Sequence, residues 1–363
     1  MATDVEERAH WVLLSMVAGI GPTWFGRLVD RFGSAKAAWS AAPLELASLG
    51  LEARAARSLI ELRARLDADA EWRRLERLGV GVLTLADPGY PPRLREIADA
   101  PPVLYLSGDL TLADEWSIAV VGTRRATAYG RQAVERVVGE VARSGVTIVS
   151  GLAKGIDTFA HRAALAAGGR TLAILGSGLD RVYPAENRRL ADEIVAQGAV
   201  VTEFPLGTPP DAINFPRRNR LLSGLTMGTL VVEADLKSGA MITATTAAEQ
   251  GRDVFAIPGS ILSPFSTGPH QLIKEGAKVV ASAADVLEEL HLNAVVEQRS
   301  AREQLPADPT EAALLALLTH EPTHVDELGR AAGLPMSVVS STLTLLELKG
   351  LARQLGGMLY VRG

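Results

Sequence analysis

Three arginines fall within four positions in the segment FPRRNR, residues 215–220, directly behind a proline. They are Arg217, Arg218 and Arg220. A guanidinium group carries a permanent positive charge and presents its N–H donors in one plane, so it pairs well with phosphate oxygens. The same flat group can stack on an aromatic ring or a base. We therefore interpret this segment as part of an anion site, most naturally a site for phosphate.

The chain around this segment does not collect positive charge. Its 363 residues include 37 lysines and arginines against 42 aspartates and glutamates, which gives a formal net charge of −5. Binding depends on the field in a cleft rather than on the total charge, so an acidic chain can still hold a polyanion locally. Any anion site here must be made by clustering.

The composition also excludes several classes of protein. The chain has no cysteine, which excludes disulfides, thiolate metal sites and cysteine nucleophiles. No stretch approaches the roughly 20 apolar residues of a membrane span, and the start MATDVEERAHW is acidic and polar, unlike a secretory signal. We expect a soluble, cytoplasmic protein of two or three domains.

The residues that could bind an anion follow short apolar runs of strand type. Because these runs are continuously apolar and alternate with alanine-rich helices, they predict a mostly parallel sheet covered on both faces. We assign residues 79–290 to an extended Rossmann-like α/β domain. The runs are SIAVVG (117–122), VTIVSG (146–151), TLAILGSG (171–178), AVVTEF (199–204), TLVVEA (229–234) and DVFAIPG (253–259).

Open parallel sheets bind ligands outside the carboxyl ends of their strands. There this chain places glycines that let a backbone approach closely, hydroxyl side chains and basic residues. Pro216 suits the first turn of the next helix, which would direct the arginines from its N-terminus. The predicted binding residues are Gly122, Thr123, Arg124, Ser150, Gly151, Lys154, Gly176, Ser177, Phe215, Arg217, Arg218, Asn219 and Arg220.

The spacing of these residues does not fit the common nucleotide motifs. Neither GTRRAT nor GSGLDR satisfies the G-x-G-x-x-G pattern of dinucleotide sites, and no G-x-x-x-x-G-K-[ST] loop is present. A mononucleotide would not need basic groups on several separate loops. A run of phosphates along a polynucleotide would.

Catalytic arrangements fit the sequence less well. Ser150, Asp157 and His161 could form a triad, but Asp157 and His161 are four residues apart on one predicted helix, where an ordinary pair explains them. Acidic residues near strand ends hold loops or pair with arginines more often than they act as catalysts. We expect no catalytic residue, metal or cofactor. The acidic residues concerned are Glu203, Glu233 and Asp235.

Residues 1–78 are predicted to form a small helical domain. Within it, residues 13–34 place a Gly-Ile-Gly turn between two amphipathic helices, which resembles a helix-hairpin-helix. The glycine N–H groups of such a turn can hold a DNA phosphate. A simple tight turn is an equally good explanation, because Arg27, Arg31 and Lys36 are the basic residues nearby.

After a polar linker at residues 291–309, residues 310–363 follow the order of a winged helix-turn-helix. Its recognition helix, MSVVSSTLTLLELKG, lacks the arginines and amides that read base edges. We predict weak or no sequence-specific duplex binding, and instead a protein contact or an accessory DNA contact through Arg353. His320 and His324 have the spacing of metal ligands, but without further ligands a zinc site is disfavoured.

Six long motifs occur in order along residues 120–277: VVGTRRATAYG, SGLAKGIDTFAHRAAL, LGSGLDRVYPAENRRL, FPRRNRLLSGL, VVEADLKSGAMITATTAAEQGRDVFAIPG and GPHQLIKEGA. With the two end domains, the chain resembles the DprA (Smf) family over nearly its whole length. Thr123 stands where the family frequently has serine, which keeps the hydroxyl.

The resemblance implies a non-enzymatic protein with an N-terminal domain of the SAM or helix-hairpin-helix type, an extended Rossmann core and a C-terminal winged helix. It implies binding and protection of single-stranded DNA during natural transformation, loading of the recombinase RecA onto DNA covered by single-stranded-DNA-binding protein, and a homodimer. The family's basic pocket maps onto Arg124, Lys154 and the three arginines of FPRRNR.

Two alternatives stay open. Nucleoside-monophosphate phosphoribohydrolases share this Rossmann branch, but their P-G-G-x-G-T-x-x-E motif is absent, and SGAMITATTAAEQG is the nearest stretch. A transcription regulator could sense a phosphorylated ligand in the Rossmann domain and read DNA with the wing. The poorly basic recognition helix weighs against it.

Overall fold

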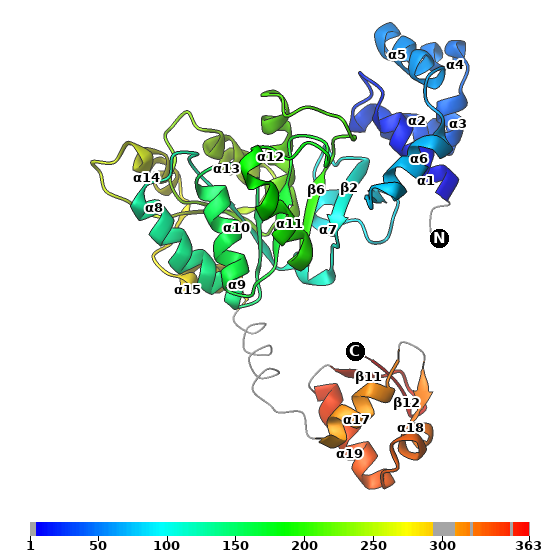
Figure 1. Cartoon of the computed structure of the whole chain (residues 1–363), viewed down its shortest axis with the longest axis vertical. Coiled ribbons are helices and arrows are strands. Elements are labelled where there is room, and N and C mark those ends of the chain that lie inside the picture. The colour runs from blue at the N-terminus through cyan, green and yellow to red at the C-terminus, as the bar shows by residue number, and fades with distance from the viewer. Residues whose placement is uncertain (1–4, 293–308, 320–321, 349–350, 363) are drawn as a thin grey trace. The chain divides into compact units, whose positions relative to one another are not determined.

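The structure is a computed structural model that describes residues 5–292, 309–319, 322–348 and 351–362 (Figure 1). The chain forms two compact units, Met1–Leu290 and His291–Gly363. The boundary predicted between residues 78 and 79 falls inside the first unit. Most of the linker predicted at residues 291–309, namely 293–308, lies outside the described residues.

Six short helices open the first unit, and their ends follow local sequence signals. Pro22 begins α2 and Gly33 closes it in the left-handed conformation, while the side chains of Ser34 and Asp67 accept hydrogen bonds at the starts of α3 and α6. The helices are α1 (Val5–Ser15), α2 (Pro22–Phe32), α3 (Ala35–Ser40), α4 (Pro43–Ser48), α5 (Ala53–Arg63) and α6 (Ala68–Arg77).

These helices share one apolar core with the edge of the sheet that follows. Leu13 and Phe25 are fully buried in the same cluster as Val82 and Tyr105, which lie on the first two strands. The N-terminal helices therefore pack as part of the first unit and do not have a core of their own.

The main sheet has nine strands in the order β1-β2-β6-β5-β4-β3-β7-β8-β9 within the described residues. Each of the six predicted runs contains a strand, and neighbours from β6 to β9 pair in parallel. The strands are β1 (Gly81–Thr84), β2 (Val103–Gly108), β3 (Ser117–Val121), β4 (Thr147–Ser150), β5 (Thr171–Ile174), β6 (Ala199–Thr202), β7 (Gly228–Val231), β8 (Asp253–Ala256) and β9 (Lys278–Val279).

Strands β1 and β2 extend the sheet beyond the predicted parallel core. They pair antiparallel with each other, and β2 pairs antiparallel with β6. This antiparallel extension is what allows the sheet edge to receive the N-terminal helices. The mostly parallel Rossmann-like fold predicted from the sequence is confirmed.

Helices cover both faces of the sheet (Figure 1). One layer holds α8 (Ala128–Ala133), which continues through a π-helical turn into α9 (Gly139–Arg143), together with α10 (Ile156–Ala166), α11 (Arg188–Gln197) and α15 (Ala283–Glu289). The other holds α7 (Pro92–Arg95), α12 (Asn214–Leu225), α13 (Gly239–Glu249) and α14 (Thr267–Lys274).

The order of the strands creates a switch point beside β3. The chain runs outward from β3 through β4 and β5 to β6, then returns through α12 to β7 on the other side of β3. The chain therefore extends the sheet in opposite directions on the two sides of β3, and ligands of such sheets bind at the carboxyl ends of the strands near this point.

The second unit is a winged helix, as predicted. Its apolar core includes Leu314, Leu328, Val339 and Leu343. A three-stranded sheet in the order β10-β12-β11 closes it. The elements are α17 (Pro309–Leu317), β10 (Thr323–His324), α18 (Val325–Ala332), α19 (Met336–Leu348), β11 (Ala352–Gln354) and β12 (Leu359–Arg362).

Among the described residues, none of the helices has the length and apolarity needed to cross a membrane.

The shared core of helices and sheet predicts that the first unit unfolds as a whole. Replacing the fully buried Leu13 with alanine should lower its unfolding free energy by about 2–5 kcal/mol. Denaturation followed by tryptophan fluorescence reports on the first unit alone, because all five tryptophans lie there, and it should give a single transition. Far-UV circular dichroism should show a transition at the same denaturant concentration, beside the contribution of the winged helix. Leu44→Ala, at a side chain that is 85% exposed, is the control and should change stability by roughly 0.5 kcal/mol or less. Separate melting of the N-terminal helices in Leu13→Ala would contradict a common core.

Candidate nucleic-acid interface

The loops that follow the parallel strands meet at one edge of the sheet. The backbone N–H of Thr123, after β3, donates to the carbonyl of Glu233, after β7, at 2.6 Å. The carbonyl of Thr123 accepts from Ile156, at the start of α10, at 3.2 Å. Farther along, the Asn187 side chain donates to the Leu152 carbonyl at 2.8 Å. The predicted binding loops are thus joined to one another directly.

The glycines at these strand ends serve the packing of the chain against itself. A Cβ at Gly151 would collide with the guanidinium of Arg218, and one at Gly176 would lie 3.0 Å from the Phe215 ring. Gly155 has φ +77°, and a Cβ there would strike the Thr123 carbonyl. A Cβ at Gly122 would meet the Ile156 side chain. Their contacts in this structure are thus with other loops, whereas the sequence suggested backbone approach to a ligand.

All three predicted hydroxyl ligands are buried. Ser150 is fully buried and its hydroxyl donates to the Val120 carbonyl at 2.7 Å. The buried Ser177 donates to the Arg181 carbonyl at 2.7 Å. Thr123 is also buried, and its hydroxyl oxygen accepts from the Arg125 N–H at 3.1 Å. These side chains stabilise the loops. The buried hydroxyls of Ser150 and Ser177 already donate to carbonyls, so the prediction that they contact a ligand directly is corrected.

Arg218 occupies the interior of this edge. It is only 4% exposed, and its guanidinium donates to the Ile174 carbonyl at the end of β5. Burial lowers the pKa of Arg218 to about 10, and the nearby carboxylate of Asp157 opposes that shift. Burial also raises the pKa of Asp157, against the effect of the Arg218 charge. The predicted phosphate contact of Arg218 is corrected to a buried structural role, because its charge faces Asp157 and a carbonyl.

Arg220 is likewise held by carboxylates. Its side chain is 11% exposed and pairs with Glu203 at 2.5 Å and with Asp99 at 3.0 Å. Burial raises the pKa of Glu203, and the charges of Arg220 and then Arg217 oppose the rise. Glu203 is therefore an ion-pair partner of the arginine cluster, as the sequence favoured, and Arg220 is not a free phosphate ligand in this structure.

The remaining predicted cations are exposed. Arg124 places its guanidinium 5.3 Å from the centre of the Phe215 ring, and Arg217 places its own 5.4 Å from the centre of Phe204. Lys154 pairs with Glu186 at 2.8 Å, although both side chains are more than half exposed. These pairings lie at the surface and can exchange for phosphate at little cost.

Tyr183 joins these residues, although the sequence reasoning missed it. It is 46% exposed, and its ring centre lies 5.9 Å from that of Phe215, which is half-buried. Its position within LGSGLDRVYPAEN, shortly behind a strand, was the available signal. Arg124, Lys154, Tyr183, Phe215 and Arg217 together are called the strand-end surface below. Asn219 lies beside it and donates to the Gly239 carbonyl at 3.3 Å.

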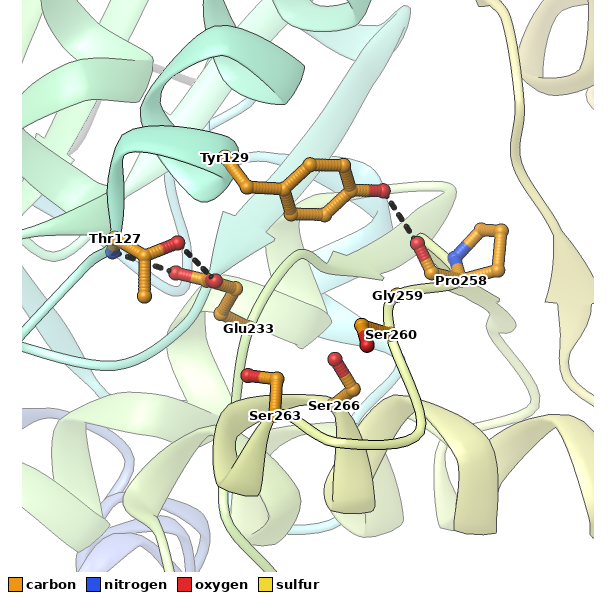
Figure 2. Close-up of a pocket in the computed structure, with 8 residues that line it drawn as sticks. All are labelled: Thr127, Tyr129, Glu233, Pro258, Gly259, Ser260, Ser263 and Ser266. Carbon is orange, nitrogen blue, oxygen red and sulfur yellow. Dashed lines mark hydrogen bonds between the residues drawn. The ribbon is translucent and has the colours of Figure 1, made fainter.

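The residues that could act as catalysts are not arranged as a catalytic site. His161 is fully buried, its Nδ1 lies 2.7 Å from the Thr171 hydroxyl, and burial lowers its pKa to about 3. Since Ser150 donates to a carbonyl, the imagined triad is not assembled. Glu233 accepts two hydrogen bonds from Thr127, at 2.9 and 2.6 Å (Figure 2). Asp235 accepts from the Lys237 N–H at 2.8 Å.

The metal alternative is not supported either. The part of the chain that the structure describes contains no group of three or more His, Cys, Asp or Glu residues placed to hold an ion. His320 lies outside the described residues, and His324 lies 3.4 Å from Asp326.

The Gly-Ile-Gly turn leads into α2 beside the arginine segment. Pro22 lines a cavity of about 790 Å³ together with Arg217 and Arg220. The basic residues of the hairpin are used locally, since Arg27 lies over Trp24 at 5.1 Å and Lys36 pairs with Glu6 at 2.6 Å. Arg31 lies 5.8 Å over Phe32.

The winged helix presents the face that its sequence predicted. The exposed side chains of α19 include Ser337, Ser340, Thr344 and Leu345, and no lysine or arginine occurs between Met336 and Leu348. Arg353 is exposed on β11. Weak or no sequence-specific binding of duplex DNA therefore remains our prediction. The exposed side chains of α19 are consistent with it.

Comparison with family models matches three segments of the chain. Residues 81–291 match the family described as DNA recombination-mediator protein A. Residues 5–73 match a DprA-like N-terminal HHH domain, and residues 298–358 match a DprA winged helix domain.

Known proteins match over similar lengths. Protein Smf of Synechocystis is 35% identical across 98% of this chain and 99% of its own. Protein Smf of Escherichia coli K12 is 44% identical across 75% of each chain.

Solved structures also match. That of DNA processing protein A from Streptococcus pneumoniae has a TM-score of 0.67 at 39% identity and covers 78% of this chain and 97% of that one. A structure from Helicobacter pylori, described as giving insight into a single-stranded DNA binding mode, has a TM-score of 0.53 at 30% identity and covers 58% of this chain and 95% of that one.

The buried histidine predicts how stability depends on pH. Because the pKa of His161 is about 3 in the folded chain against an ordinary value of 6.5, the unfolded chain binds the extra proton between these values. The unfolding free energy should therefore fall as pH drops below about 6.5, by up to about 1.4 kcal/mol per pH unit. His161→Gln should make that fall shallower by a similar amount. Denaturant titrations from mildly acidic to neutral pH test this, and parallel profiles for the two proteins would refute it.

Proposed function

The chain belongs to the DprA family of DNA recombination-mediator proteins, and on that premise we propose that it binds and protects single-stranded DNA along the strand-end surface. The observation that carries the proposal is the grouping of three exposed cations with two aromatic rings at the carboxyl ends of the parallel strands. Binding consists of phosphate neutralisation by the cations and stacking of bases on the rings.

The cations come from three separate segments, which suits a chain of phosphates. Arg124 follows β3, Lys154 precedes α10 and Arg217 lies in the first turn of α12. One nucleotide could not use all three, whereas a polynucleotide presents a phosphate at every step. The mild acidity of the whole chain confines a strand to this surface and disfavours binding elsewhere.

The two rings explain a preference for single strands. Unpaired bases expose flat faces that stack on aromatic side chains, whereas paired bases are already stacked within a duplex. Phe215 and Tyr183 lie next to each other, and Arg124 packs on Phe215, so cation and rings act on the same nucleotides. The Tyr183 ring, which is 46% exposed, is also available without any rearrangement of the core.

A mediator of recombination hands its strand to a recombinase, and the family description supports that role for this chain. The proposal therefore includes loading of RecA onto single-stranded DNA, including DNA covered by single-stranded-DNA-binding protein, during natural transformation. It includes a homodimer acting in the cytoplasm. It includes no catalytic chemistry, since the candidate acids and bases are engaged in loop-holding hydrogen bonds.

Removing two exposed cations tests the surface. The double variant Arg124→Ala/Arg217→Ala should bind labelled poly-dT at least tenfold more weakly, because hydrogen bonds to charged groups contribute about 1.5–3 kcal/mol each. The slope of log affinity against log salt should become shallower by roughly 0.7 for each phosphate that is no longer neutralised. Fluorescence anisotropy at several salt concentrations, beside a duplex of equal length, measures both.

The matched control is Arg189→Ala, an arginine that is 92% exposed on α11 and pairs with Glu193. It should leave affinity and salt slope unchanged. Wild-type affinity and slope in the double variant would overturn the assignment of the surface. Absence of any binding by the wild-type chain at low salt would overturn the proposed function itself.

The pair of Lys154 and Glu186 gives a test in which a substitution should strengthen the binding of single-stranded DNA. Since Glu186 lies 2.8 Å from the Lys154 ammonium, it competes with phosphate and repels it. Glu186→Gln should therefore tighten poly-dT binding at low salt by up to about fivefold, the range of exposed ion pairs. Glu193→Gln on α11 is the matched control and should not change it. Weaker binding by Glu186→Gln would show that no phosphate approaches Lys154.

A further inference from the structure

A second cavity opens on the other side of the switch point, and the strand-end surface does not use it. It measures about 470 Å³ and lies where the chain leaves β3, β7 and β8 (Figure 2). This is the size range of small-ligand sites in proteins. Its lining residues are Thr127, Tyr129, Glu233, Pro258, Gly259, Ser260, Ser263 and Ser266.

Glu233 is fixed at one end of this cavity. The side chain is 2% exposed, and Thr127 binds one carboxylate oxygen through its backbone N–H and the other through its hydroxyl. A Cβ at Gly130 would collide with the carboxylate, so glycine there keeps its position open. Each carboxylate oxygen accepts one of these bonds and retains a lone pair for a further donor.

Serine hydroxyls supply the other polar groups. Ser266 is 4% exposed, and within the described part of the chain its hydroxyl makes no hydrogen bond. The hydroxyl oxygens of Ser260 and Ser263 accept from the N–H groups of Leu262 and Phe265, which leaves their protons free to donate. The hydroxyl of Ser266 lines the cavity and is not sealed within the protein, so it is accessible to a polar group of a ligand.

The remaining walls are flat and apolar. Tyr129 is held by a hydrogen bond of 2.5 Å from its hydroxyl to the Pro258 carbonyl, and it is 48% exposed. Figure 2 shows its ring on one side of the space and the side chains of Ser263 and Ser266 on the opposite side. A planar ligand can lie against the tyrosine ring with its edge toward the hydroxyls.

The charge of the lining decides which chemistry fits. None of the eight lining residues is lysine or arginine, and the carboxylate of Glu233 repels phosphate. One carboxylate among hydroxyls is too few ligands for a metal ion. The cavity favours a neutral, flat ligand that carries N–H donors and ring acceptors on its edge.

We propose that this cavity is a nucleobase site, in which the base lies against Tyr129, an amino group of the base donates to Glu233, and ring acceptors receive hydrogen bonds from the serine hydroxyls. The base has two possible sources. One is a free nucleoside. The other is an unstacked base of a bound single strand, and this source rests on the proposed function. Residues 122–127 connect the two regions, because Arg124 belongs to the strand-end surface and Thr127 to the cavity.

Isothermal titration with free nucleosides tests the first source. Adenosine, cytidine and guanosine carry an exocyclic amino group and should bind several-fold more tightly than thymidine, which lacks one. Because nucleosides are uncharged, their affinity should hardly change with salt, unlike that of a polyanion. Tyr129→Ala, which removes the flat wall, and Ser260→Trp, which fills the cavity from an exposed position, should each abolish this binding.

Leu262→Ala is the matched control, since this side chain is 89% exposed in the same loop and does not line the cavity. It should bind nucleosides as the wild type does. Thermal unfolding of all three variants establishes that they are folded, which is expected because Tyr129 is 48% exposed, Leu262 is 89% exposed and Ser260 is also an exposed residue.

Oligonucleotides test the second source. If a strand supplies the base, oligo-dA and oligo-dC should bind more tightly than poly-dT, and Tyr129→Ala and Ser260→Trp should remove that preference while poly-dT affinity persists. Nucleoside binding or such a base preference, lost in both variants and kept in Leu262→Ala, supports the site. Absence of both overturns it. A failure of this nucleobase site can be distinguished from a failure of the proposed function, because the proposed function is tested with poly-dT and the arginine variants.

Discussion

The buried charge of Arg218 is the interaction on which the strand-end loops depend. A guanidinium removed from water needs a compensating charge and acceptors. Asp157, in the first turn of α10, provides the charge, and the Ile174 carbonyl at the end of β5 provides an acceptor. The arrangement also requires a residue without a side chain at Gly151. One side chain on α12 thereby fixes the positions of the loops after β4 and β5. Lys154 projects from the loop after β4.

The three arginines of residues 215–220 have different roles because they point in different directions from α12. Consecutive residues of a helix point about 100° apart, so Arg217 and Arg218 cannot face the same way. Arg218 points into the sheet edge, Arg220 reaches the carboxylates Glu203 and Asp99, and Arg217 is left at the surface. Three positive charges in the sequence thus become one exposed charge and two that hold the fold together.

Much of the fold was predictable because parallel strands buried on both faces are continuously apolar, and each run was long enough to be recognised. Strands β1 and β2 were not predicted, because antiparallel edge pairing depends on partners far along the chain. At the site, residue type and position after a strand indicated the correct loops. They could not indicate that Ser150 and Arg218 face inward, nor that Tyr183 packs beside Phe215, since these depend on tertiary contacts.

The two regions beside the switch point have opposite chemistry, and the same loop explains why they can coexist. On one side, exposed cations project from loops whose carboxylates are already paired, so the local field favours phosphate. On the other, the carboxylate of Glu233 stands among hydroxyls without a cation in the lining, so phosphate is repelled and a base edge is favoured. A nucleotide combines these two chemistries in one molecule. Since Arg124 and Thr127 are three residues apart, the loop after β3 contributes a residue to each of the two regions.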